Sequence, residues 1–104
     1  MGGEPHPTAI FCWHDRVAYQ VLEACEQLGL CVPRDVSVIG YDGLRWPSST
    51  VHLATSVHVD IEQLARRGMH LLDRYIQGYD GPLLEETLPV SLTTGTTLGS
   101  APQP

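Results

Sequence analysis

The hydrophobic positions in the first part of the chain predict a strand, a helix and a second strand. Residues 8–13 (TAIFCW) are β-branched and aromatic, which is typical of a short buried strand. Residues 16–28 then place apolar side chains three and four positions apart, so we expect an amphipathic helix with Asp15 as its N-cap. Gly29 is suited to end this helix, and residues 36–41 (VSVIGY) form the next apolar run. The order predicts a βαβ unit with two parallel strands.

The second half of the chain predicts an extended segment, another helix and an edge strand. Residues 52–59 (HLATSVHV) alternate between apolar and polar positions, as an extended segment does. Asp60 with Gln63 forms a capping-box pattern at the start of a second helical stripe, over residues 61–77. Residues 88–92 (LPVSL) alternate again, which favours a half-buried or edge strand. These elements indicate an α/β fold with a mostly parallel sheet, whose two faces need more cover than two helices provide.

Composition and charge narrow the class of protein. The chain has 104 residues, 42% hydrophobic and 17% charged, as expected for one globular domain. The net charge of -6 argues against direct binding to DNA or to an anionic membrane. We see no apolar run that could span a bilayer and no secretory leader, and three cysteines without CxxC spacing fit a reduced, cytoplasmic setting. Residues 1–7 are expected to be a disordered chain edge, and residues 99–104 a frayed tail.

Polar side chains follow both predicted parallel strands where each strand ends. Ligands of open α/β sheets bind outside the carboxyl ends of such strands. There, Asp42 would accept hydrogen bonds from ligand hydroxyls or amines, His14 would donate or accept, and Trp13 would form a wall. The alternatives are a turn-forming aspartate before Gly43 and a helix start with a solvated histidine.

Two further groups of residues have competing interpretations. Cys12 and His14 lie two positions apart and could form a nucleophile pair or part of a metal site, but no third group follows at a diagnostic spacing. We therefore expect Cys12 to be a core residue, and we expect neither catalysis nor a metal or cofactor. Arg45-Trp46-Pro47 suits either the face of a sugar ring or an interface, and an interface is favoured.

Taken together, these segments resemble the lac-repressor-like (LacI/GalR) family of transcriptional regulators over residues 8–98. The segment PRDVSVIGYD (33–42) is the most specific part of the resemblance. The order and spacing of three others support it: TAIFCWHD (8–15), ATSV (54–57) and LPVSL (88–92). The resemblance implies the C-terminal part of a periplasmic-binding-protein-like effector domain, a partial Rossmann-like three-layer fold. It also implies that helix 61–77 belongs to the other lobe, so here we expect the helix to pack on this half-sheet or to swap into a second copy.

The resemblance also implies a function and roles for individual residues. It implies the effector-sensing and dimerisation portion of a regulator that binds a small polar, sugar-like molecule. This portion would be a homodimer controlling DNA binding by an N-terminal domain outside this chain. Asp42 matches the effector-contacting aspartate, with Trp13 and with His14 in place of the usual asparagine. The proposed interface positions are Tyr19, Leu22 and Trp46. The alternatives are a solute-binding protein of the periplasmic sugar-binding type, a structural dimerisation module without a ligand, and a small hydrolase.

Overall fold

The computed structural model describes residues 6–103 and divides the chain into two compact units. Unit 1 joins the described residues up to His58 with those from Ser91 onward, and unit 2 comprises Val59–Val90. The predicted disordered edge at residues 1–7 falls mainly on residues 1–5, which lie outside the described residues, as does residue 104 of the predicted tail.

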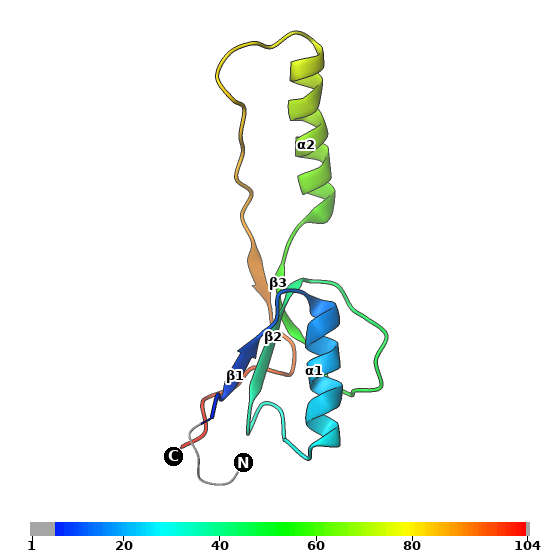
Figure 1. Cartoon of the computed structure of the whole chain (residues 1–104), viewed down its shortest axis with the longest axis vertical. Helices are drawn as coiled ribbons and strands as arrows, with labels where there is room; N and C mark the ends of the chain where they lie inside the picture. Colours follow the sequence, from blue (N-terminus) through cyan, green and yellow to red (C-terminus); the bar gives the residue numbers. More distant parts are fainter. Residues whose placement is uncertain (1–5, 104) are drawn as a thin grey trace. The chain divides into compact units, whose positions relative to one another are not determined.

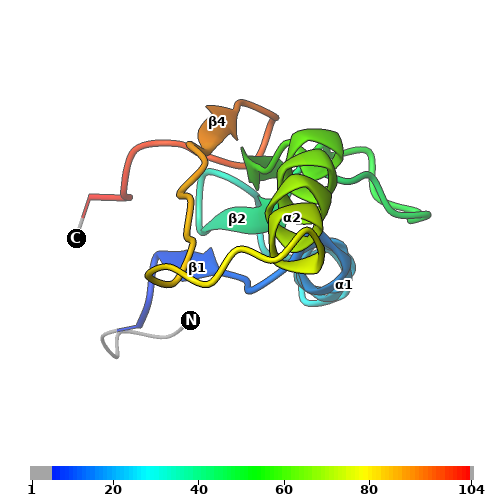
Figure 2. The same ribbon diagram turned by 90° about the horizontal axis from the view of Figure 1, so that it is seen from above.

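Unit 1 is built on a four-stranded sheet in the order β1 (Ala9–Phe11), β2 (Ser37–Asp42), β3 (Thr55–His58) and β4 (Ser91–Thr93), shown in Figures 1 and 2. β1, β2 and β3 run parallel, and β4 is antiparallel to β3. The α/β fold with a mostly parallel sheet is thereby confirmed. The strand expected at residues 88–92 begins later, at β4.

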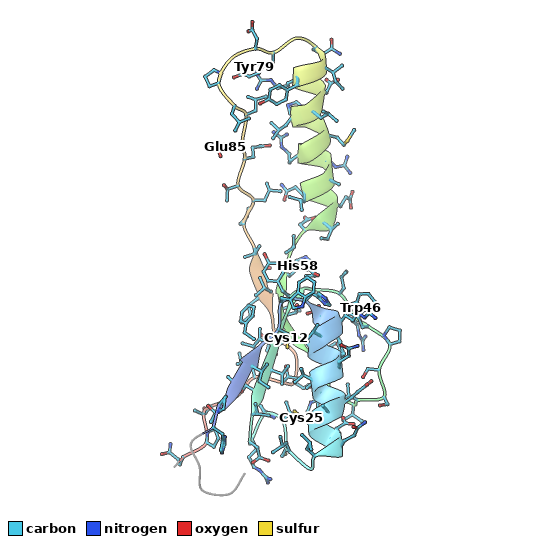
Figure 3. The ribbon with its side chains drawn as sticks, in the orientation of Figure 1. Cys12, Cys25, Trp46, His58, Tyr79 and Glu85 are labelled. Atoms are coloured by element: carbon cyan, nitrogen blue, oxygen red, sulfur yellow. The ribbon has the colours of Figure 1, made fainter. Side chains whose placement is uncertain are left out.

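One helix covers one face of this sheet. α1 (Asp15–Gln27) connects β1 to β2, and Ala18 and Leu22 of α1 and Val38 of β2 are completely buried between the two layers. Strand alternation turns every second residue of β2 toward the helix. The other buried hydrophobic residues of this core are Cys12, Tyr19, Cys25, Val32, Val36 and Ala54. Figure 3 labels Cys12, just beyond β1, and Cys25 on α1; both cysteines are buried and free.

The opposite face of the sheet carries apolar side chains that the other described residues of unit 1 do not cover. Phe11 is 64% exposed and Leu92 is 54% exposed. Tyr41 and Val57, which pair in register with each other, are half-buried.

A short segment after β4, which no local sequence pattern predicted, adds to the hydrogen bonding of the sheet. Thr97 is completely buried; its hydroxyl donates to the Val38 carbonyl at 2.6 Å and accepts from the Thr55 amide at 2.9 Å. The Val38 amide in turn donates to the Thr97 carbonyl at 2.9 Å. Thr97 thus lies beside β2 next to the start of β3, and its hydrogen bonds connect the two strands there. Gly99 exchanges hydrogen bonds with the Ser37 hydroxyl, so contacts with the sheet extend to Gly99.

Unit 2 consists of a helix and the chain that returns along it. α2 (Ile61–Ile76) begins with Asp60 as its N-cap, whose carboxylate accepts from the Gln63 amide at 3.0 Å, as predicted. The Tyr75 hydroxyl accepts from the Leu84 amide at 2.8 Å, and Arg67 forms a bidentate ion pair with Glu86. These contacts bind the returning chain to the helix.

The apolar stripe of α2 is exposed, and no residue of this helix is buried. Its members are Ile61, Leu64, Met69, Leu72, Tyr75 and Ile76. Neither of the helices that the structure describes is long and apolar enough to cross a bilayer. Packing of this helix on the half-sheet or exchange into a second copy stays a prediction.

Candidate functional site

The carboxyl ends of β1 and β2 bring two of the predicted ligand-binding residues to one edge of the sheet. Phe11 pairs with Ile39 across the two parallel strands, and His14 and Asp42 each follow three residues later. Both side chains are half-buried. Trp13 is 75% exposed, and its ring lies edge-on to the His14 ring with 3.9 Å between centroids. An acidic, a basic and an aromatic side chain therefore share this edge.

Asp42 has an unusual backbone conformation at the tip of β2. Its φ is 105°, in a region that residues other than glycine rarely adopt. Gly43 follows with φ 78°, and a Cβ at this position would lie 2.6 Å from His58 Nδ1. His58 is the register partner of Asp42 on β3, and Figure 3 labels it at the end of that strand. The turn after Asp42 thus needs glycine and passes directly beside His58, a neighbour that the sequence analysis did not assign to the site.

The N-cap of α1 is His14, so the prediction that Asp15 caps the helix is wrong. His14 has extended backbone angles, and its Nδ1 accepts from the Val17 amide at 3.4 Å. An imidazole that accepts at Nδ1 carries its proton on Nε2 when neutral. His14 can therefore present a hydrogen-bond donor at the edge where Asp42 presents acceptors.

Asp15 instead occupies the first turn of α1 and points inward. Its side chain is almost completely buried, with a residue exposure of 1%. Oδ2 accepts from the Leu44 amide at 2.6 Å, and Oδ1 accepts from the Ser56 hydroxyl at 2.7 Å. The Ser56 oxygen also accepts from the Gly43 amide at 3.0 Å. This network, which sequence reasoning missed, ties α1, β3 and the turn after Asp42 together.

Gly40 makes room for the Asp15 carboxylate. A Cβ at Gly40 would lie 2.0 Å from Asp15 Oδ1 and 3.2 Å from the Ala18 methyl group. A lone glycine inside a strand otherwise rich in β-branched and aromatic residues often marks a close approach by another group. That glycine is the one signal in the sequence that pointed to this network.

The loop after β2 is attached to the outer side of α1. The Glu23 carboxylate accepts from the Ser48 hydroxyl at 2.6 Å and from the Ser49 amide at 3.2 Å, and these bonds lower the pKa of Glu23 below its usual range. The Arg16 guanidinium lies 5.9 Å from the centre of the Trp46 ring, which Figure 3 shows beside α1. The loop and the helix thereby line a shallow hollow, formed by Arg16, Tyr19, Gln20, Glu23, Trp46 and Pro47.

Two of the three predicted interface positions lie in the core. Leu22 is completely buried, and Tyr19 is 5% exposed with its hydroxyl accepting from the Ala54 amide at 3.2 Å. The assignment of Leu22 to a dimer interface is corrected, because a side chain completely buried under α1 is closed to a partner. Tyr19 is almost completely buried but lines the hollow beside Trp46, so its place in an interface stays a prediction. Trp46 is 40% exposed and remains accessible.

Cys12 lacks the environment of a nucleophile. Burial raises the pKa of its thiol, and the nearby Asp15 carboxylate and Cys25 raise it further, so the reactive thiolate is disfavoured. Within residues 6–103, histidine, cysteine, aspartate and glutamate side chains form no group of three that could hold a metal ion.

A mostly parallel α/β sheet with polar side chains at the carboxyl ends of adjacent strands is the arrangement of a ligand-binding lobe. Residues 1–98 match the family of periplasmic binding protein-like domains. The chain belongs to this family, and its similarity to LacI-type transcriptional regulators places it within their effector-binding domain.

Three relatives illustrate this similarity. The HTH-type transcriptional repressor PurR of Escherichia coli is 38% identical over 88 residues, which cover 83% of this chain and 26% of the repressor. A lac repressor dimer bound to operator and the anti-inducer ONPF superimposes with a TM-score of 0.77 at 32% identity, covering 89% of this chain and 32% of that one. A LacI family regulator from an Arthrobacter species, in complex with lactose, gives 0.73 at 26% identity, covering 86% and 34%. The chain thus spans about a quarter of the length of the curated relatives it matches.

Proposed function

We propose that this chain is the effector-sensing and dimerisation portion of a LacI-type transcriptional regulator. The effector is a small polar molecule of the sugar class, and its binding changes the affinity of the parent protein for DNA through a separate domain. The lactose complex of the Arthrobacter relative and the operator complex of the lac repressor support this assignment. The acidic charge of the chain fits a role in which another domain contacts DNA.

The observation that carries the proposal is that Asp42 and His14 both lie at the carboxyl ends of adjacent parallel strands, three residues beyond the register pair Ile39 and Phe11. Asp42 offers carboxylate acceptors and His14 offers an Nε2 donor, so together they satisfy a hydroxyl group, which both donates and accepts. The exposed Trp13 ring beside His14 provides an apolar face of the kind that packs on the C–H side of a sugar ring.

Asp42→Asn is expected to weaken effector binding by about 10- to 100-fold, because a hydrogen bond to a charged group contributes about 1.5–3 kcal/mol. A thermal-shift screen of mono- and disaccharides, lactose included, on the full-length protein selects the saccharide, and calorimetric titration then measures its affinity. Asp80→Asn, an exposed aspartate in unit 2, is the matched control and should bind as the wild type does. Equal affinities for Asp42→Asn and the wild type would contradict the role of Asp42.

The dimerisation part of the proposal rests on Trp46. Trp46 is 40% exposed and lines the hollow on the outer side of α1, and the loop that carries it is fixed by Glu23. Exposed tryptophan held on a rigid support is typical of residues that dominate an interface.

Trp46→Ala is therefore expected to weaken self-association of the full-length protein by at least about 30-fold, as removal of an interface hot spot does. Sedimentation equilibrium measures the dissociation constant directly. Trp13→Ala removes an even more exposed indole at the effector edge and should leave self-association unchanged. A Trp46→Ala protein that dimerises like the wild type would exclude this surface as the interface.

A further inference from the structure

The backbone that follows Asp42 is fixed by side chains from two other elements. The Gly43 amide donates to the Ser56 hydroxyl oxygen, and the Leu44 amide donates to Asp15 Oδ2. Ser56 belongs to β3 and Asp15 to α1, so the two amides directly after Asp42 are bound to the sheet and to the helix.

These two hydrogen bonds matter because the backbone conformation of Asp42 is intrinsically unfavourable. A non-glycine residue at φ 105° is strained, and such a conformation persists only where the surroundings impose it. The hydrogen bonds that the Gly43 and Leu44 amides donate hold the chain directly after Asp42. The direction of the Asp42 carboxylate therefore depends on groups that are themselves buried beneath the edge.

The Asp15 carboxylate is the centre of this arrangement. It is 1% exposed and both of its oxygens are engaged, one by the turn and one by Ser56, which in turn binds Gly43. A buried carboxylate with two donors is a fixed anchor, because breaking either bond leaves a charge without its partner in a low-dielectric region. Gly40 keeps the space for it open.

We infer that Asp15 is a positioning residue for effector recognition: with Ser56 it fixes the turn after Asp42 and thereby aims the Asp42 carboxylate at the effector. Asp15 itself is covered by the turn and makes no contact with the effector. This inference rests on the proposed role of Asp42, and it adds a second aspartate that acts only through the first.

The test combines single and double variants of the full-length protein with the saccharide selected in the thermal-shift screen. In Asp15→Asn the amide oxygen can still accept from the Leu44 amide, but the amide nitrogen then faces Ser56 and can only donate to it. The Ser56 hydroxyl hydrogen loses its acceptor, and both contacts lose the negative charge of the carboxylate, so the hold on the turn is weaker. We expect about tenfold weaker binding in Asp15→Asn and no further loss when it is added to Asp42→Asn, as coupled residues behave in a double-mutant cycle. Ser56→Ala is expected to behave like Asp15→Asn.

Asp35→Asn is the matched control for general loss of stability. Asp35 also accepts from a backbone amide, that of Cys31 at 2.7 Å, but it precedes β2 at the opposite end of the strand. Its replacement should leave saccharide affinity unchanged. If Asp35→Asn and Asp15→Asn weaken binding equally, Asp15 acts through stability alone and the inference is overturned.

A second measurement follows the positioning without any ligand. Hydrogen exchange at the Gly43 and Leu44 amides should accelerate in Asp15→Asn and not in Asp35→Asn, since only the former releases the turn. Unchanged exchange at both amides would overturn the inference even if no saccharide bound.

If Asp42→Asn weakens binding while Asp15→Asn does not, only the positioning role fails. If Asp42→Asn has no effect, the proposed function fails, and the exchange rates still show whether Asp15 fixes the turn.

Discussion

Replacing Gly40 with alanine is expected to lower the free energy of unfolding by about 3 kcal/mol or more. The new methyl group would lie 2.0 Å from Asp15 Oδ1 and 3.2 Å from the Ala18 Cβ. The carboxylate must therefore move, and it loses at least one of its bonds to Leu44 and Ser56. Overpacking a core costs about 1–3 kcal/mol, and a lost hydrogen bond to a charged group costs a similar amount again. Urea unfolding of the full-length protein measures the change.

Gly68→Ala is the control that separates crowding from the general effect of a methyl group. Gly68 lies inside α2, and nothing lies within 4 Å of the position that its Cβ would occupy. Alanine there is expected to stabilise the helix by up to about 1 kcal/mol, because glycine is the poorer helix former. A Gly40→Ala protein as stable as Gly68→Ala would show that Asp15 does not need the space beside β2.

Leu22→Ala is expected to destabilise unit 1 by about 2–5 kcal/mol, the usual cost of truncating a buried leucine. Leu22 is completely buried at the centre of the contact between α1 and the sheet, beside Ala18 and Val38. Urea or thermal unfolding gives the magnitude.

Leu28→Ala removes the same atoms at the end of the same helix. Leu28 is the C-cap of α1 and is 74% exposed, so its replacement is expected to change the stability by less than about 0.5 kcal/mol. Comparable losses at the two positions would mean that α1 packs on the sheet through a different face.

The local elements of this fold were accessible from the sequence because their signals are local. The spacing of Ala18, Leu22 and Cys25 predicted the buried stripe of α1, and all three are buried. The Asp60 cap also needed only a partner three residues away. Such patterns depend on helix and strand periodicity, which neighbouring residues determine.

The residues that build the site could not all be predicted from local sequence patterns, because their contacts join parts of the chain that are far apart. The capping rule assigned Asp15 to its own helix, whereas its partners Leu44 and Ser56 lie 29 and 41 residues further along the chain. Leu22 was assigned to an interface by resemblance, although its side chain is buried against its own sheet and cannot also meet a partner. Thr97 gave no pattern, since its two partners come from β2 and β3.

The excursion of the chain through unit 2 has a consequence for folding kinetics. The chain leaves the sheet after His58 and returns at Ser91, which pairs directly with His58. The sheet then closes through contacts of high sequence separation, 42 residues between Thr55 and Thr97 and 62 between Ser37 and Gly99. Contacts between residues so far apart in the sequence slow folding. The entropic cost of closing the loop formed by unit 2, however, rises only slowly with the length of that loop. The sheet is therefore expected to be completed late, and changes in the length of unit 2 should affect the rate of folding more than the stability of the sheet.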